Sequence, residues 1–291
     1  MDKRSPNILI SVLRGGRLAL HLFYGMLLAV IYPHLNQARQ HRVMKSWNRH
    51  LLDILNISIQ IEGSHQLACG KGGCLLVANH VSWLDIIVLN AIHPSRFIAK
   101  SEVRNWPIVG WLCHRSGTVF IERAMRRDTS TINQRVGALL KQGVCIGLFP
   151  EGTTTDGKQV GHFHSALIQP AIDAGIGVCP VALRYQDKEG EPSIAATFIG
   201  DTTLAQSIWN ILRCSHLSAL VMFNPALPTT NKNRRVLARA AQAAIALKLQ
   251  NIGIARQATT QQAVSAVPQT IMSSQSAYAL LVDPLVQQLQ E

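Results

Sequence analysis

A histidine and a carboxylate lie five residues apart where an apolar segment gives way to polar residues. Cys74 to Asp85 reads CLLVANHVSWLD, a pattern that predicts a buried strand, a polar turn and the start of a helix. Function in α/β sheets collects at such strand ends. With His80 in the turn and Asp85 in the first helical turn, the carboxylate can orient the imidazole while the other ring nitrogen takes a proton. This spacing therefore suits a general base with an orienting partner.

The same residues also have a purely structural explanation. Ser82-x-x-Asp85 is the spacing of a capping box, in which Asp85 would only satisfy backbone donors at the start of the helix. A histidine followed five residues later by an aspartate is common by chance. Both interpretations remain open on this segment alone.

Two further segments carry polar residues at the ends of predicted strands. Gly117 to Arg123 (GTVFIER) contains Phe120 and ends in Arg123, a cation that can hold an anionic substrate group or be solvated. Phe149 to Thr153 (FPEGT) supplies a carboxylate, a glycine that permits close backbone approach, and a hydroxyl. Alone, this second segment is an ordinary turn.

A third segment, Val178 to Leu183 (VCPVAL), is apolar and contains a proline. Because Pro180 cannot donate to a ladder, the segment predicts an edge strand or the wall of a pocket.

The ordered set of these segments is more specific than any one of them. NHxSWxD, GxxFIxR, FPEGT and VxPVxL follow one another between Asn79 and Leu183, and this order closely resembles the four blocks of the glycerolipid acyltransferase family, of the lysophosphatidic acid acyltransferase type. The resemblance implies an α/β fold with a central mixed sheet flanked by helices. It also implies direct transfer of a fatty acyl group from coenzyme A or acyl carrier protein to a lysolipid hydroxyl, with no acyl-enzyme and no cofactor.

The resemblance assigns roles to individual residues. His80 would deprotonate the acceptor hydroxyl, and Asp85 would orient its imidazole. The substrate-binding residues that it implies are Phe120, Arg123, Glu151, Gly152 and Thr153.

The acceptor is the point on which the sequence departs from the family pattern. Many members continue FPEGT with Arg-Ser, whereas Thr154-Thr155-Asp156-Gly157 follows here, so a cation that could contact an acceptor phosphate is missing. FPEGTTTDG is similar to a subgroup that includes lyso-ornithine lipid acyltransferases, whose acceptor headgroup carries no phosphate. The expected reaction converts lysophosphatidic acid to phosphatidic acid, with lyso-ornithine lipid as the alternative acceptor.

Composition favours a membrane partner over a nucleic acid. Of 291 residues, 47% are hydrophobic and 15% charged, and the net charge is +12. An anionic partner suits this charge, but aromatic residues make up only 5%, too few for the aromatic and cationic interleaving of nucleic-acid binders. A non-catalytic basic protein that binds anionic membrane or nucleic acid remains the alternative from a different class. The six cysteines form no CxxC pair and indicate a reducing compartment.

The amino-terminal residues 1–56 predict a membrane-associated helical hairpin. Basic residues precede an apolar run from Leu18 to Tyr32 that lacks a signal-peptidase site. At ~1.5 Å per residue this run reaches about 23 Å, which predicts a partly inserted helix rather than a span. Residues 37–55 predict a basic amphipathic helix whose cations face anionic headgroups. We expect binding to one leaflet of the inner membrane, with the active site on the cytoplasmic face, where the thioester donor is found.

Alternating strand and helix patterns predict an α/β domain over residues 57–253, which the resemblance implies is the acyltransferase domain. Residues 254–291 predict a poorly ordered tail. Residues 195–200 (AATFIG) are among the expected strands, and residues 231–252 predict the last helix. Three other signals are rejected. Gln159 replaces the hydroxyl residue of a P-loop, His162 and His164 are too weak a pattern to predict a metal, and no GxSxG occurs.

Overall fold

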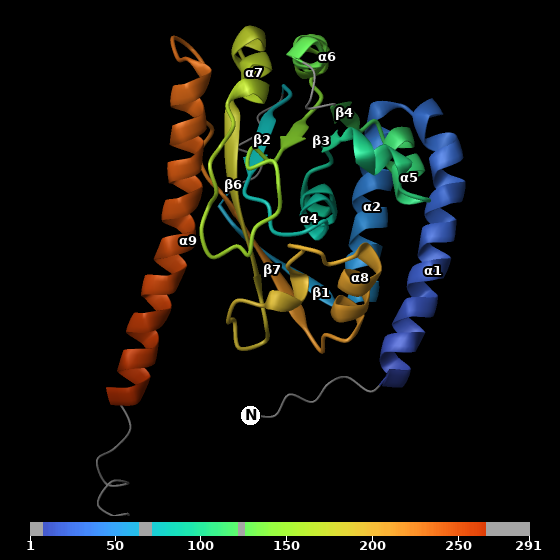
Figure 1. Ribbon diagram of the computed structural model, residues 1–291, viewed down its shortest axis with the longest axis vertical. Coiled ribbons are helices and arrows are strands. Elements are labelled where there is room, and N and C mark those ends of the chain that lie inside the picture. The colour runs from blue at the N-terminus through green and yellow to red at the C-terminus, as the bar shows by residue number, and fades with distance from the viewer. Residues whose placement is uncertain (1–7, 64–71, 122–125, 266–291) are drawn as a thin grey trace, which may run out of the picture. The chain divides into compact units, whose positions relative to one another are not determined.

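The computed structural model describes residues 8–63, 72–121 and 126–265, and at 126–129 and 253–265 it describes only the helical backbone. Contacts divide the chain into Met1–Lys248 and Leu249–Glu291, and the site lies in the first unit. The helices are labelled in Figure 1. They are α1 (Ile8–Ile31), α2 (Gln37–Leu55), α4 (Leu84–Ile92), α5 (Val109–Arg115), α6 (Arg126–Lys141), α7 (Gln169–Ala174), α8 (Leu204–Leu212) and α9 (Arg234–Ser265), with 3-10 turns η1 (Tyr32–His34), η2 (Ser101–Asn105), η3 (Ala166–Ile168) and η4 (Ile194–Ala196).

The described residues form one seven-stranded mixed sheet in the order β1-β7-β6-β2-β5-β3-β4. Neighbouring strands are parallel except for the antiparallel pair β6 and β7. This confirms the predicted α/β fold with a central mixed sheet. The strands are β1 (Ile57–Glu62), β2 (Leu75–Ala78), β3 (Arg96–Lys100), β4 (Val119–Ile121), β5 (Ile146–Leu148), β6 (Val178–Gln186) and β7 (Leu217–Phe223).

Two strand predictions were wrong. Residues 195–200 form no strand, and the last strand is instead β7, in which every residue is buried. β6 is not an edge strand, because it lies between β7 and β2. The Pro180 carbonyl accepts from the backbone N–H of Asn224, just past the last residue of β7. The N–H that proline lacks would point the same way, beyond the end of the β7 ladder, and the sheet therefore tolerates the proline.

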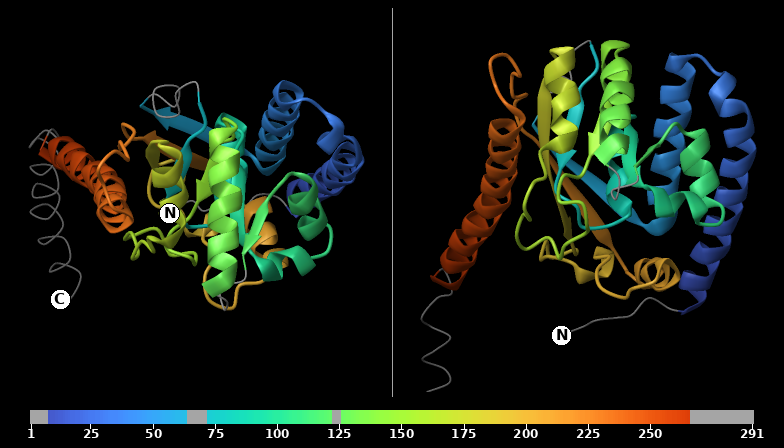
Figure 2. Two further views of the ribbon diagram at one scale, coloured as in Figure 1. Left: turned by 90° about the horizontal axis from the view of Figure 1, so that it is seen from above. Right: turned by 45° about the horizontal axis from the view of Figure 1, so that its top comes forward.

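The strand order creates a switch point at the centre of the sheet. From β2 the chain passes through α4 to β3 on one side, whereas from β5 it passes through α7 to β6 on the other. Right-handed crossovers in opposite directions place α4 and α7 on opposite faces. The helices α6 and α7 pack side by side (Figure 2). Ligands of open α/β sheets bind outside the carboxyl ends of strands at such a point, here β2 and β5.

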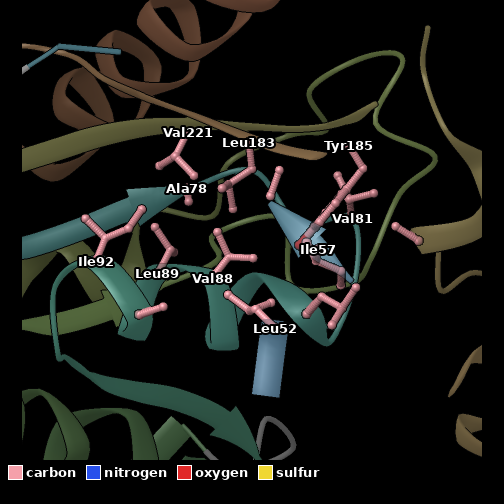
Figure 3. Packing of buried hydrophobic residues seen from close by; sticks show 14 of the residues in the cluster. Leu52, Ile57, Ala78, Val81, Val88, Leu89, Ile92, Leu183, Tyr185 and Val221 are labelled. Carbon is pink, nitrogen blue, oxygen red and sulfur yellow. The ribbon is translucent and has the colours of Figure 1, made fainter. Parts of the chain in front are cut away.

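The core on the α4 face fixes β2 relative to its neighbours. Alternate residues of each strand share a face, so Ala78 of β2 and Leu183 of β6 meet the same helix. Figure 3 shows Val88 and Leu89 of α4 directed toward these strands, with Val81 beside Tyr185. Because Ala78 at the end of β2 and Val81 in the turn both belong to this core, apolar packing anchors the polar turn after β2.

The amino-terminal helix is longer than the apolar run suggested. The prediction of a segment of about 15 residues was wrong, because α1 spans 24 residues and includes Arg14. The Arg14 guanidinium donates to the carbonyls of Leu212 and Cys214 at the end of α8, so its charge is satisfied by the protein. At ~1.5 Å per residue α1 is about 36 Å long, and by length and hydropathy it is the one described helix that could cross a membrane.

Unlike a helix of a water-soluble protein, α1 exposes a large apolar face. Its inward face carries small, polar and apolar residues, among them Ser11, Leu18 and His21. Large apolar side chains such as Leu20 and Phe23 point outward, 72% and 56% exposed. An outward apolar face of this length is what an apolar solvent would cover.

Packing along α1 ties it to the rest of the first unit. It runs beside α2 (Figure 1), where the His21 ring stacks on Trp47 at 4.8 Å and its Nε2 lies 3.0 Å from the Trp47 carbonyl oxygen. At the end of α1, Arg115 of α5 donates to the carbonyls of Ala29 and Val30, at 2.8 Å and 2.6 Å. These bonds satisfy carbonyls that a helix end otherwise leaves without partners.

Candidate active site

His80 and Asp85 pair at the carboxyl end of β2. The turn after β2 carries His80, and Asp85 lies in the first turn of α4. Nδ1 of His80 is 2.8 Å from Oδ2 of Asp85, and the Asp85 side chain is fully buried. The pairing required by the sequence hypothesis is therefore formed.

Asp85 also holds the backbone of the turn. Its Oδ2 accepts from the backbone N–H groups of Val81 and Ser82, at 2.8 Å and 3.0 Å. The reciprocal capping box is not formed, since the buried Ser82 hydroxyl makes no hydrogen bond within the described chain. Both interpretations of the spacing thus hold in part, because one carboxylate satisfies backbone donors and orients the imidazole.

The His80 ring is fixed on a second side by aromatic stacking. It lies over Phe149 with ring centroids 4.1 Å apart and an interplanar angle of 10°. With Nδ1–H donating to Asp85, the tautomer set by this network leaves a lone pair on Nε2. The side chain is 19% exposed, so that nitrogen can meet a substrate. The arrangement can accept a proton at a defined position.

Glu151 lies opposite His80, at the carboxyl end of β5. Its Oε1 accepts from the His80 N–H at 2.9 Å, and its Oε2 accepts from the Gly161 N–H at 3.1 Å. Burial raises the pKa of Glu151, and the two backbone hydrogen bonds act against that rise. Because both oxygens accept backbone N–H groups, this carboxylate joins the segments that follow β2 and β5 to the segment at Gly161.

The residues after Glu151 also attach to the turn that carries His80. Gly152 has a φ of +75°, which favours glycine, and Thr153 is exposed. The backbone N–H and the hydroxyl of Thr155 both donate to the His80 carbonyl, at 2.8 Å and 3.2 Å. The Thr154 hydroxyl donates to the Phe198 carbonyl. The threonines that stand where many family members have Arg-Ser thus bind the backbone around the histidine.

The remaining predicted site residues belong to β4 and the residues after it. Phe120 lies in β4, partly buried, at the far edge of the sheet from β1. Arg123 lies outside the described residues. The adjacent β3 ends in Lys100, an exposed cation that shares the carboxyl edge of the sheet.

Sequence reasoning missed two residues that build the site. Asn79 is buried and forms two hydrogen bonds to the backbone of Leu183 on β6, at 2.8 Å and 2.9 Å. Tyr185, two residues further along β6, donates its hydroxyl to Oδ1 of Asp85 at 2.8 Å. Asn79 heads the NHxSWxD block, a signal that was available. Tyr185 lies 100 residues from Asp85, and no local pattern connects them.

Comparisons with known proteins agree with this geometry. The family model described as Acyltransferase matches residues 58–184. Lyso-ornithine lipid O-acyltransferase of Pseudomonas aeruginosa is 38% identical over 210 residues, which cover 72% of this chain and 79% of that protein. 1-acyl-sn-glycerol-3-phosphate acyltransferase of Neisseria meningitidis is 38% identical over 184 residues, covering 63% of this chain and 71% of that protein.

The fold has a counterpart among solved structures. The crystal structure of the 1-acyl-sn-glycerophosphate (LPA) acyltransferase PlsC from Thermotoga maritima aligns with a TM-score of 0.57, at 20% identity, over 82% of this chain and 98% of that chain. At this identity the likeness supports the fold alone. Together with the ordered motifs and the similar relatives, these matches establish that the chain belongs to the glycerolipid acyltransferase family and is an O-acyltransferase.

Proposed function

We propose that this enzyme transfers a fatty acyl group from a thioester of coenzyme A or acyl carrier protein to the free hydroxyl of a lysophospholipid, lysophosphatidic acid first of all, in phospholipid biosynthesis. The observation that carries the proposal is the His80–Asp85 pair at the switch point of the sheet, with Nδ1 bound to the carboxylate at 2.8 Å. The thioester is a co-substrate, and the chemistry needs no cofactor and no metal.

The chemical step is a direct transfer. Nε2 of His80 takes the proton from the acceptor hydroxyl as its oxygen attacks the thioester carbonyl. Asp85 orients the ring and stabilises the imidazolium that forms. When the tetrahedral intermediate collapses, the carbon–sulfur bond breaks, and the imidazolium returns its proton to the leaving thiolate. Acyl ester and free thiol are the products, and the enzyme is unchanged.

The binding of the acceptor headgroup is assigned to Phe120, Arg123, Gly152 and Thr153. Glu151 belongs with them by family resemblance, although its two backbone hydrogen bonds favour a supporting role. Arg123 would supply the charge for a phosphate.

Lyso-ornithine lipid is the second candidate acceptor. Two observations favour it: a relative of 38% identity is named a lyso-ornithine lipid O-acyltransferase, and Thr154 and Thr155 stand in place of Arg-Ser. The hydroxyls of both threonines bind backbone carbonyls, so this segment offers no cation for a phosphate at those positions.

A membrane surface is the proposed second partner. The outward apolar face of α1 and the exposed cations Arg39, Arg42 and Arg49 on α2 suit an anionic leaflet. We place the protein on the inner membrane with the active site on the cytoplasmic face, where a water-soluble thioester meets a lipid acceptor. Because α1 is bound along its length by α8, α2 and α5, a helix lying in one leaflet fits better than a helix that crosses alone.

Acyl transfer by membranes containing wild type or His80→Ala tests the proposal. A labelled acyl thioester is offered with lysophosphatidate or with lyso-ornithine lipid. We expect wild-type acylation of lysophosphatidate that the variant lacks. Transfer only to lyso-ornithine lipid would select the second acceptor, and equal activity of variant and wild type would overturn the role of His80.

A further inference from the structure

We propose that Tyr185 is a positioning residue for acyl transfer, which fixes the Asp85 carboxylate and through it both the orientation of His80 and the charge that faces its ring. The inference rests on the proposed function and extends it to a residue of β6. The matched family region ends at residue 184, so Tyr185 lies just beyond it.

The two oxygens of Asp85 are engaged differently. Oδ2 accepts three donors, from His80 Nδ1 and from two backbone N–H groups of the turn. Oδ1 accepts the Tyr185 hydroxyl, the one donor to that oxygen within the described chain. A buried carboxylate oxygen with no donor is costly. Tyr185 therefore sets the rotation of the carboxylate about its Cβ–Cγ bond, and this rotation decides where Oδ2 meets the imidazole.

Tyr185 is held rigidly enough to act in this way. It is 3% exposed, its backbone pairs with Ala219 of β7, and its carbonyl accepts from the Ser193 N–H at 3.0 Å. Two residues earlier, Leu183 is joined to Asn79 by two hydrogen bonds, which fix β6 against the turn that carries His80. Burial, with the Asp85 charge second, raises the pKa of Tyr185 well above its ordinary value, so the hydroxyl remains a donor at every working pH.

The Tyr185 hydroxyl also affects the negative charge of Asp85 that faces the His80 ring. The titratable groups around the pair are the Asp85 carboxylate on α4, Tyr185 on β6 and Glu151 after β5. By donating to Asp85, Tyr185 neutralises part of its charge and weakens its hold on an imidazolium. Removal of the hydroxyl should therefore strengthen that hold. Because the neutral ring is the active base, the acidic limb of the pH–rate profile should move to higher pH.

Tyr185→Phe in the full-length, membrane-bound enzyme tests this directly, with Tyr32→Phe as the matched control that loses a tyrosine hydroxyl on η1. We expect kcat to fall roughly tenfold with KM for the acceptor nearly unchanged, as for other partners that orient a functional side chain. The acidic limb should rise by roughly half a pH unit to one unit, while the control matches wild type. A folded Tyr185→Phe enzyme with the kcat and pH profile of wild type would overturn the proposal.

A double-mutant cycle separates action through Asp85 from general damage. If Tyr185 acts only through that carboxylate, Tyr185→Phe should cost little in an Asp85→Asn background. Costs that multiply in the double variant would contradict the proposal. Should Tyr185→Phe unfold, 3-fluorotyrosine at position 185, a stronger donor of nearly the same shape, is expected to shift the acidic limb to lower pH. An unchanged limb there would count against the proposal.

A readout without substrate separates this inference from the proposed function. The Nδ1–H proton of His80, observed by NMR, reports the hydrogen bond to Asp85, and its signal should change in Tyr185→Phe whether or not the acceptor has been identified. If wild type acylates no lysolipid, the proposed function fails while this measurement still decides the role of Tyr185. An unchanged Nδ1–H signal would contradict that role.

Discussion

Asp85 shows how one residue serves folding and chemistry together. Its four hydrogen bonds join the imidazole, two backbone groups of the turn and a tyrosine from another strand. Glu151 does the same for the opposite side of His80, through the backbone rather than the ring. Each carboxylate keeps the base in place, and its hydrogen bonds offset the free energy that burying its charge costs.

Glu151→Gln tests the burial of that second carboxylate. The folded pKa is raised above the ordinary value of 4.5, so between the two values the folded state binds more protons than the unfolded state. The contribution of Glu151 to stability is therefore largest at low pH and falls as pH rises through that interval. We expect the stability of wild type relative to Glu151→Gln to decline over the same interval in urea unfolding in detergent. A difference that grows with pH would contradict this assignment.

At the scale of elements, the close contact of α1 and α2 depends on a glycine. A Cβ on Gly25 would lie 2.7 Å from Nε1 of Trp47, which the stacked His21 ring holds in place. Gly16 on the same helix has no neighbouring atom within 4 Å of such a Cβ. An alanine at Gly16 therefore tests helix propensity alone, whereas an alanine at Gly25 also tests the packing of α1 on α2.

Gly25→Ala should destabilise the hairpin by about 1–3 kcal/mol through overpacking. Gly16→Ala should leave stability unchanged or raise it by up to about 1 kcal/mol, because alanine favours a helix. Thermal unfolding in detergent, with tryptic cleavage at the exposed Arg17 as a second readout, measures both variants. Equal effects of the two substitutions would show that α1 does not pack on Trp47 in this way.

The elements around the site were predictable where apolar runs ended in polar residues, as at His80 and Glu151. The sequence located α2 at 37–55 because its apolar and basic faces are distinct. The sequence did not predict β7, because every residue of that strand is buried and apolar and polar residues therefore do not alternate. It also did not predict the length of α1, because the carbonyls that accept hydrogen bonds from Arg14 are distant in the chain. Tyr185 could not be predicted, since its partner is brought to it only by strand order.

At the scale of the whole molecule, charge and apolar surface act together. In the proposed membrane association, the net charge of +12 would attract an anionic surface over a distance, and the outward face of α1 would offer apolar area for insertion at contact. The lipid acceptor would then reach the switch point from the leaflet while the thioester arrives from water.

The double substitution Phe23→Ser and Leu27→Ser should weaken binding to anionic vesicles, because each substitution removes an exposed apolar side chain that would insert into the leaflet. We expect a loss of roughly tenfold or more per residue, measured by vesicle flotation. Ile61→Ser on β1, 46% exposed in the native protein, is the matched control and should bind like wild type. Equal losses in the control and the α1 variant would remove α1 as the membrane surface.

The proposed function depends on His80 as the base of an acyl transfer to a lysolipid. Its test is the initial rate of transfer from a labelled acyl thioester to lysophosphatidate and to lyso-ornithine lipid, in membranes with equal amounts of wild type and His80→Ala. We expect the variant to lose about 10²–10⁴ in rate with the acceptor that wild type uses. Equal rates in the two proteins would show that His80 is not the base.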